Sequence, residues 1–365
     1  MTMNMTTPRE DGFWTRGEHE RHSGTIIIFP ERTDIWRNDA KIAQKLIIDL
    51  ANIIITYEDV YFCIKPHLVS LIKGKLDNKV KIIEIEYDDI WARDISPNFV
   101  VNNSEIRAVC WNFNSWGGLE EGAYFPWDKD VAFAKTLSDI LGLKKYIVDE
   151  IVLEGGAVIA DGAGTIYTTK NVLLNKNRNP AFSQAQIERY LKDYFSAEHI
   201  VWLEDGLALD ETNGHVDNIC SIVKPQELCL AWTDQNSDPQ YHVSRQALKT
   251  LQHSSDVKVI HKIPIPSPQF ITADEERGLC QTTTSTNRVE GFQLVPSYIN
   301  YYLINSALIF PTFQCVEDEI AHNFLQKVFP EREIIPINAR ELSIGGGGFH
   351  CIMHEIPSVP QKLEG

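Results

Sequence analysis

The stretch GAVIADGAGTIYTT, residues 156–169, shows most clearly the pattern that decides the fold. Two apolar runs flank the turn residues DGAG at 161–164, which predicts a β-hairpin. A helix is expected from Ser183, because Ser183 and Gln186 have the spacing of a capping box. The apolar run HIVWL at 199–203 then predicts another strand. The repeating unit is therefore a hairpin, a helix and a strand.

The same order of elements recurs before and after this stretch. The preceding copy is expected to have strands at 80–87 and 98–113, a helix at 128–143 and a strand from 146. The next copy runs VDNICSIV (216–223), ELCLAWT (227–233), a helix over 241–252 and KVIHKIPI (258–265). The fourth runs YINYYLINSALIF (298–310), a helix over 316–328 and EIIPIN (333–338).

A fifth copy is divided between the two ends of the chain. A strand at 349–352 can join TIIIF (25–29), a helix over 39–50 and VYFCI (60–64). Five units closed by both ends predict a ring, which leaves few free sheet edges. Alternation of strands and helices alone would favour an ordinary α/β domain. Since no linker divides the chain, residues 1–365 are expected to form one domain.

Composition limits the classes of function. The 365 residues include 34 Lys and Arg against 50 Asp and Glu, a net charge of −16, and 43% are hydrophobic. No apolar run approaches the ~18 residues of a membrane span, and the first residues lack the apolar run of a signal peptide, so a cytoplasmic protein is expected. The acidic balance disfavours nucleic acid and favours a cationic small molecule. Whether the chain forms homo-oligomers is left open.

Four short motifs stand at the entrances of successive hairpins. They are Trp91–Asp94 (WARD), Leu153–Gly156 (LEGG), Gly214–Asn218 (GHVDN) and Gly345–Cys351 (GGGGFHC). Equivalent positions of a ring of repeats face a common axis. One pocket is therefore expected to contain the side chains of Asp94, Glu154, His215, Asp217 and Cys351.

Two of these motifs suggest particular chemistry. His215 and Asp217 are two residues apart in a predicted strand, which would place both side chains on one face. Cys351 follows four glycines, which allow a ligand to approach the backbone closely and favour a nucleophile. The alternative is a flexible loop followed by a buried cysteine. The seven cysteines contain no CxxC pair, which argues against a disulfide framework and a thiolate zinc site.

The histidine and glycine motifs favour neither a metal site nor a nucleotide site. His350 and His354 are four residues apart, as helical metal ligands are, but in a strand they would lie ~13 Å apart. The pair His19 and His22 has no matching third ligand motif. The glycine runs lack the GK[ST] ending of a phosphate loop.

One Cys and one His beside three acids distinguish two classes of enzyme. A cysteine peptidase needs an oxyanion hole, and nearby carboxylates would repel the developing oxyanion. Carboxylates bind a planar guanidinium well, because its N–H groups form a rigid fork. The positive charge of a guanidinium would also favour the thiolate of the cysteine.

The chain resembles agmatine deiminases (agmatine iminohydrolases) of the guanidino-group modifying, or pentein, superfamily. The resemblance extends from DGFW near the start to the region of Pro357. It is carried by WARDISP (91–97), FNSWGGLEEGAYFPWDKD (113–130), LEGGAVIADGAGTIYTT (153–169), ETNGHVDN (211–218), SYINYYLIN (297–305), INARE (337–341) and GGGGFHC (345–351).

The resemblance implies a five-bladed α/β propeller and a hydrolase that converts agmatine to N-carbamoylputrescine and ammonia, a step of polyamine biosynthesis. It also implies that the enzyme uses no metal or organic cofactor. It implies that Cys351 is the nucleophile of a covalent thiouronium intermediate and that His215 is the general acid and base. Asp94 and Asp217 are then expected to bind the guanidinium, and Glu154 to support it or His215.

The remaining substrate contacts are also expectations of this resemblance. Trp91 and Trp116 could line the aliphatic part of the substrate, although core packing is an equal alternative for both. Glu211 could face the distal ammonium, and Gly347 is expected at the substrate.

Three departures from the family pattern bear on substrate choice. They are Gly348 where the family commonly has Asn, Thr15–Arg16–Gly17 in place of a hydrophobic-Pro segment, and Val295–Pro296 where small residues are usual. Two other functions stay open. One is a deiminase of free or peptide-terminal arginine, which would need a cation in the pocket, and the other is a polyamine-binding scaffold without turnover.

Overall fold

The computed structural model describes residues 6–360 and contains an α/β fold built on mixed sheets. Four three-stranded sheets share one plan: an antiparallel pair is followed by a third strand that runs parallel to the second. Their strands are β4 (Asn98–Val101), β5 (Ile106–Asn112) and β6 (Lys145–Val152); β7 (Val158–Ala160), β8 (Thr165–Thr169) and β9 (His199–Leu203); β10 (Cys220–Lys224), β11 (Glu227–Trp232) and β12 (Val259–Pro264); β15 (Tyr302–Ile304), β16 (Ala307–Thr312) and β17 (Glu333–Asn338).

The two ends of the chain share a fifth sheet, as predicted. Its order is β18 (Met353–Pro357), β1 (His22–Ile28), β2 (Asp59–Ile64) and β3 (Lys81–Glu84). The strand expected at 80–87 thus pairs with β2 in this sheet, and its predicted place in the copy with residues 98–113 is wrong. Strand β18 runs antiparallel to β1 and places His354 opposite Ile26, while β2 runs parallel to β1. The strand predicted at 349–352 is wrong, because those residues form a turn and β18 begins at Met353. The left-handed φ of +105° at Gly346 ends the preceding helix just before this turn.

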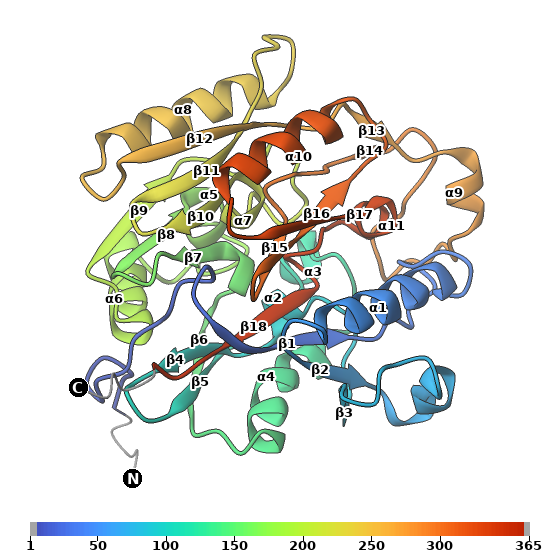
Figure 1. The fold of residues 1–365 in the computed structure, drawn as a ribbon, viewed down its shortest axis with the longest axis horizontal. Coiled ribbons are helices and arrows are strands. Elements are labelled where there is room, and N and C mark those ends of the chain that lie inside the picture. Colours follow the sequence, from blue (N-terminus) through green and yellow to red (C-terminus); the bar gives the residue numbers. More distant parts are fainter. Residues whose placement is uncertain (1–5, 361–365) are drawn as a thin grey trace.

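A long helix connects the second and third strands of each plan. These helices are α1 (Lys41–Ile54), α4 (Asp128–Ile140), α6 (Gln184–Phe195), α8 (Gln240–His253) and α10 (Glu317–Val328). In Figure 1, α1, α4, α6 and α8 lie at the periphery of the molecule, whereas the short helices α2 and α7 lie near its centre. Helix α6 has the predicted capping box and buries Ile187, Leu191 and Phe195 along one face. Burial of each such side chain stabilises the fold by roughly 1.5–3 kcal/mol.

The other elements are short. They are η1 (Pro66–Ile72), α2 (Ala92–Ile95), α3 (Gly118–Glu121), η2 (Gly155–Ala157), α5 (Lys170–Leu173), α7 (Val216–Ile219), β13 (Gln269–Phe270), α9 (Ala273–Arg277), β14 (Gln293–Leu294) and α11 (Arg340–Gly345). Within residues 6–360, no helix combines the length and the apolar character that a bilayer span requires.

One of the predicted strands is partly a helix. Residues Val216–Ile219 form α7, a single helical turn, and the strand β10 begins only at Cys220. His215 is the residue that precedes this helix, so His215 and Asp217 are not two residues of one strand face as predicted. The change matters for the site, because a helical turn rather than a strand directs both side chains.

Candidate active site

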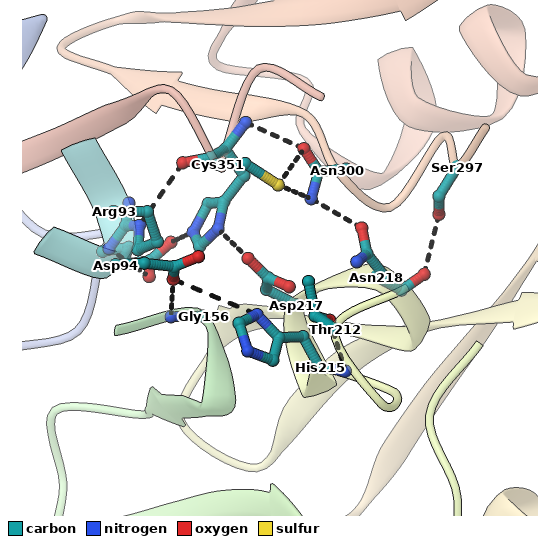
Figure 2. Close-up of polar contacts among 12 residues, drawn as sticks. Arg93, Asp94, Gly156, Thr212, His215, Asp217, Asn218, Ser297, Asn300 and Cys351 are labelled. Carbon is teal, nitrogen blue, oxygen red and sulfur yellow. Dashed lines mark hydrogen bonds and ion pairs between the residues drawn. The ribbon is translucent and has the colours of Figure 1, made fainter. Parts of the chain in front are cut away.

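Each of the five sheets with three or four strands is preceded by a short turn that carries a polar side chain. Asp94 lies on α2 before β4, Glu154 directly precedes η2 before β7, and Asp217 lies on α7 before β10. Asn300 follows the turn at 298–299 before β15, and Cys351 lies in the turn at 349–352 before β18. Figure 2 shows Asp94, Asp217, Asn300 and Cys351 close to one another, although they come from different parts of the chain.

Asp94 is the most heavily bonded of these carboxylates. Its Oδ2 accepts a hydrogen bond from Trp116 Nε1 at 2.9 Å, and its Oδ1 accepts one from the backbone N–H of Gly156 at 2.9 Å. The same Oδ1 lies 4.0 Å from Nδ1 of His215 (Figure 2). Burial raises the pKa of Asp94 to about 6, against the opposing effect of His215. The carboxyl of Asp94 therefore loses its proton at a pH that lies just below neutral.

Gly156 is at the point where three functional groups meet. A Cβ at this position would lie 2.6 Å from His215 Nδ1, 2.8 Å from Asp217 Oδ2 and 3.0 Å from Asp94 Oδ1. These distances are too short for any side chain. The second glycine of LEGG is thus required by the close approach of the three groups to the backbone.

Cys351 is buried, and its sulfur contacts Asn300. The Asn300 amide nitrogen donates to Cys351 Sγ at 3.3 Å, and the turn is tied to α2 by the Arg93 N–H, which donates to the Cys351 carbonyl at 3.1 Å. Burial raises the pKa of the Cys351 thiol well above its usual value, and the carboxylates of Asp217 and Asp94 raise it further. Without a bound cationic ligand, Cys351 is therefore a neutral thiol at neutral pH.

Of the buried side-chain atoms that lack a hydrogen-bond partner in the described residues, three belong to site residues predicted from the sequence. They are Glu154 Oε2, His215 Nε2 and Asp217 Oδ1. All three residues are at most 2% exposed. Buried polar atoms are normally paired, so three unpaired ones on neighbouring residues mark a place where a ligand's donors can bind.

Glu154 is held by a buried arginine. Arg178 Nε donates to Glu154 Oε1, and neither side chain is exposed to solvent. The other nitrogens of Arg178 donate to Asn213 Oδ1 at 2.9 Å and to the Thr212 carbonyl at 3.1 Å. Arg178 therefore connects Glu154 to the loop that leads into His215, and it leaves Glu154 Oε2 free.

A cavity leads from the surface to Cys351. It is lined by the predicted residues Trp91, Asp94, Trp116, Glu211 and Cys351, together with Arg288, Tyr124 and others. The indoles of Trp91 and Trp116 meet edge to face, with ring centroids 6.0 Å apart. Both tryptophans are thus fixed walls of the cavity and also part of the buried core.

Glu211 already has a partner in this cavity. Arg288 Nη1 lies 2.6 Å from Glu211 Oε2, and Arg288 Nε donates to the Ile344 carbonyl at 2.9 Å. Burial raises the pKa of Glu211, and Arg288 opposes that effect. Glu211 is therefore paired with an arginine, as Glu154 is, but it is not among the buried carboxylates that keep an unpaired oxygen.

Comparisons with known proteins identify the family. A family model described as Porphyromonas-type peptidyl-arginine deiminase matches residues 14–357. Agmatine deiminase of Pseudomonas aeruginosa is 42% identical over an alignment of 368 residues, which covers 99% of this chain and 100% of that protein. The agmatine deiminase of Ectopseudomonas mendocina is 40% identical, with 98% and 99% coverage. The chain belongs to the agmatine deiminase family.

A solved structure agrees with this membership. The structure described as agmatine deiminase of Enterococcus faecalis catalyzing its reaction has a TM-score of 0.94 and 33% identity to this chain. The match covers 98% of this chain and 99% of the other.

The remaining residues singled out from the sequence lie as follows. Gly347 packs against Trp91 and Cys351, since a Cβ on it would lie 2.4 Å from the Trp91 ring and 3.2 Å from Cys351 Cβ. Gly348 packs against Asn300, with 2.3 Å between such a Cβ and Asn300 Oδ1. Residues 15–17 line a different cavity, on the side of Arg93 and His354. That departure from the family pattern thus lies outside the cavity that contains Cys351.

Sequence reasoning missed several residues of the site. Asn300 lies in the SYIN motif, at the position in the fourth repeat that the other candidates occupy in theirs, so the repeat itself could have found it. The sequence marks His350 only through its spacing to His354, yet its Nδ1 lies 2.8 Å from Asp217 Oδ2. Arg178 and Glu18 lie outside the repeated positions, and no local pattern marks them.

Proposed function

We propose that this protein hydrolyses agmatine to N-carbamoylputrescine and ammonia, with Cys351 as the nucleophile. The observation that carries the proposal is the set of unpaired buried atoms, Glu154 Oε2, Asp217 Oδ1 and His215 Nε2. Their residues surround Asp94, which with Asp217 also acts on the Cys351 thiol. The full-length similarity to agmatine deiminases supports the choice of substrate.

Binding of the guanidinium would use the free carboxylate oxygens. Its N–H donors can pair with Glu154 Oε2 and Asp217 Oδ1, the two oxygens that the protein leaves without donors. A charge contact near 4 Å contributes up to ~4 kcal/mol at an effective dielectric of ~20, before desolvation is deducted. The bound cation also offsets the carboxylates that raise the pKa of the Cys351 thiol, so it promotes formation of the thiolate.

The first chemical step forms a covalent intermediate. The Cys351 thiol gives its proton to His215, and the sulfur forms a bond to the guanidinium carbon. The carbon–nitrogen bond of one terminal amino group then breaks, and His215 returns the proton to that leaving group, which departs as ammonia. The product is an S-alkylthiouronium on Cys351.

The second step uses water. His215 removes a proton from the water, and the oxygen attacks the thiouronium carbon. The carbon–sulfur bond breaks, and the Cys351 sulfur recovers the proton from His215. The second proton of the water leaves the oxygen for solvent, where the released ammonia takes it up as ammonium, and N-carbamoylputrescine departs. The step consumes one water and restores the enzyme.

The aliphatic chain and ammonium of agmatine would extend towards the outer end of the cavity. The edge-to-face pair of Trp91 and Trp116 provides apolar walls for the four methylene groups. Glu211 would accept the distal ammonium, while it shares its charge with Arg288.

We also infer that residues 1–365 form a single five-bladed α/β propeller whose axis passes through the site. Five sheets of similar plan, each preceded by a turn with a site residue, support this arrangement. We place the enzyme in the cytoplasm, where the seven cysteines, all free thiols in the described residues, would stay reduced.

An arginine deiminase is the second candidate, and one observation favours it. Arg288 is a cation in the cavity, as recognition of a substrate carboxylate requires. However, Glu211 neutralises it at 2.6 Å, so agmatine is the better fit.

Ammonia release from agmatine, free arginine and a short arginine peptide, measured side by side, tests the assignment. Agmatine should react fastest by a wide margin. Preference for arginine or the peptide would overturn the choice of substrate. If none of the three releases ammonia, the remaining function is a polyamine-binding scaffold without turnover.

A further inference from the structure

The residue directly before the nucleophile forms a bridge between two carboxylates. His350 Nδ1 lies 2.8 Å from Asp217 Oδ2, and His350 Nε2 lies 2.8 Å from Glu18 Oε2. His350 is 5% exposed, so water contributes little to its bonding. Both ring nitrogens therefore have an acceptor carboxylate as partner.

This bridge decides which oxygen of Asp217 is free. Oδ2 is occupied by His350, whereas Oδ1 has no partner. Rotation of the carboxylate would break the 2.8 Å contact to His350 inside a buried site. Asp217 is thus held in the one orientation that presents Oδ1 to a ligand.

We propose that His350 is a positioning residue that fixes Asp217 for guanidinium binding, and that Glu18, from the N-terminal segment, fixes His350 in turn. The inference rests on the proposed function, which it deepens by assigning roles to two residues that do not themselves contact the substrate. Glu18 is also held by Arg93, whose Nη1 lies 3.2 Å from Glu18 Oε1. A series of side-chain contacts thus links α2, the N-terminal segment, the turn with Cys351 and α7. It runs through Arg93, Glu18, His350 and Asp217.

The charge of His350 follows from its surroundings. Burial and Arg93 lower its pKa, but Glu18 and Asp217 outweigh them and raise the pKa to about 9. The titratable and charged groups that face it are Asp217 on α7, Glu18, Arg93 on α2, Tyr302 on β15 and His354 on β18. The imidazolium is the form that can donate to both carboxylates at neutral pH.

Two amide substitutions separate the halves of the bridge. The Asn amide nitrogen of His350→Asn can take the place of Nδ1 and keep the bond to Asp217. His350→Gln places its amide nitrogen near Nε2, where it can reach Glu18 but not Asp217. If positioning of Asp217 is the role, kcat/KM for agmatine should be at least about tenfold lower in the Gln variant than in the Asn variant, as expected when a residue that orients a ligand group is lost.

A second measurement does not depend on any substrate. The pH titration of the His350 imidazole, followed by NMR in histidine-labelled protein, should have its midpoint shifted to lower pH by Glu18→Gln. Glu20→Gln is the matched control, because Glu20 lies in the same segment and pairs with Arg16 instead. It should leave the midpoint unchanged.

The outcomes are distinguishable. Ammonia release by the wild type tests the proposed function, whereas the ratio of the two His350 variants and the NMR midpoint test the bridge. Equal kcat/KM for the Asn and Gln variants, or an unshifted midpoint in Glu18→Gln, would overturn the inference. If both His350 variants unfold, as judged by circular dichroism, the Glu18→Gln titration still decides.

Discussion

The site has two groups of carboxylates that differ in their pairing. The inner end of the site is defined here by Glu154 and Asp217, which are buried and do not line the cavity, and each of them keeps one oxygen without a partner. At the outer end, Glu211 is partly exposed and already pairs with Arg288 at 2.6 Å. The inner carboxylates lose their water when the protein folds, and their unpaired oxygens are left without hydrogen-bond donors. A bound guanidinium supplies those donors. The inner end should therefore dominate recognition, and the outer end should adjust it.

The largest effect is expected from removal of the nucleophile at the inner end. Cys351→Ala should lower kcat for agmatine by at least about 10³-fold, because no covalent intermediate can form. Cys280→Ala, at an exposed cysteine, is the matched control and should keep wild-type kcat. Residual activity of Cys351→Ala close to wild type would contradict the role of this end.

Neutralising an inner carboxylate should have the next largest effect. Asp217→Asn replaces a charged acceptor by an amide and should lower kcat/KM by about 10²-fold. Asp205→Asn is the control, since Asp205 bonds to Asn171 at the exposed surface. Steady-state kinetics on both variants provides the comparison, and equal values would show that the unpaired oxygen is not used.

The pH dependence should report Asp94. Because its pKa is raised to about 6, Asp94 is ionised above that pH and protonated below it. Protonation removes a negative charge from the guanidinium site, so kcat/KM should fall as the pH drops through 6. Asp94→Asn should flatten this acid limb while lowering the plateau. An acid limb of unchanged shape in that variant would assign it to another group.

The smallest effect is expected at the outer end. Glu211→Gln should raise KM for agmatine about fivefold, equal to ~1 kcal/mol, as for a partly exposed ion pair. n-Butylguanidine, which has no distal ammonium, should show no such change. If Glu211→Gln lowered kcat/KM for agmatine more than Asp217→Asn does, the outer end and not the inner end would dominate recognition.

The sequence predicted the repeated units well, because each long helix and apolar strand has its own periodicity. The capping box at Ser183 and the pairing of a C-terminal strand with the N-terminal one are both confirmed. Helix α7 was predicted as a strand, since four residues are too few to show a helical period.

The sequence could predict only those site residues that stand at equivalent positions of the repeated units. Asp94, Glu154, Asp217 and Cys351 do, and the structure brings them together. Arg178 is 24 residues from Glu154, and Glu18 is 332 residues from His350. Such contacts depend on tertiary packing, which no local pattern encodes.

The central claim is that Cys351 attacks the guanidinium carbon. Mass spectrometry of acid-quenched enzyme during turnover tests it most directly, with His215→Asn included to slow hydrolysis of the adduct. The peptide that contains Cys351 should gain the mass of agmatine less that of ammonia. An unmodified Cys351 peptide in both proteins during active turnover, or full activity in Cys351→Ser, would contradict the claim.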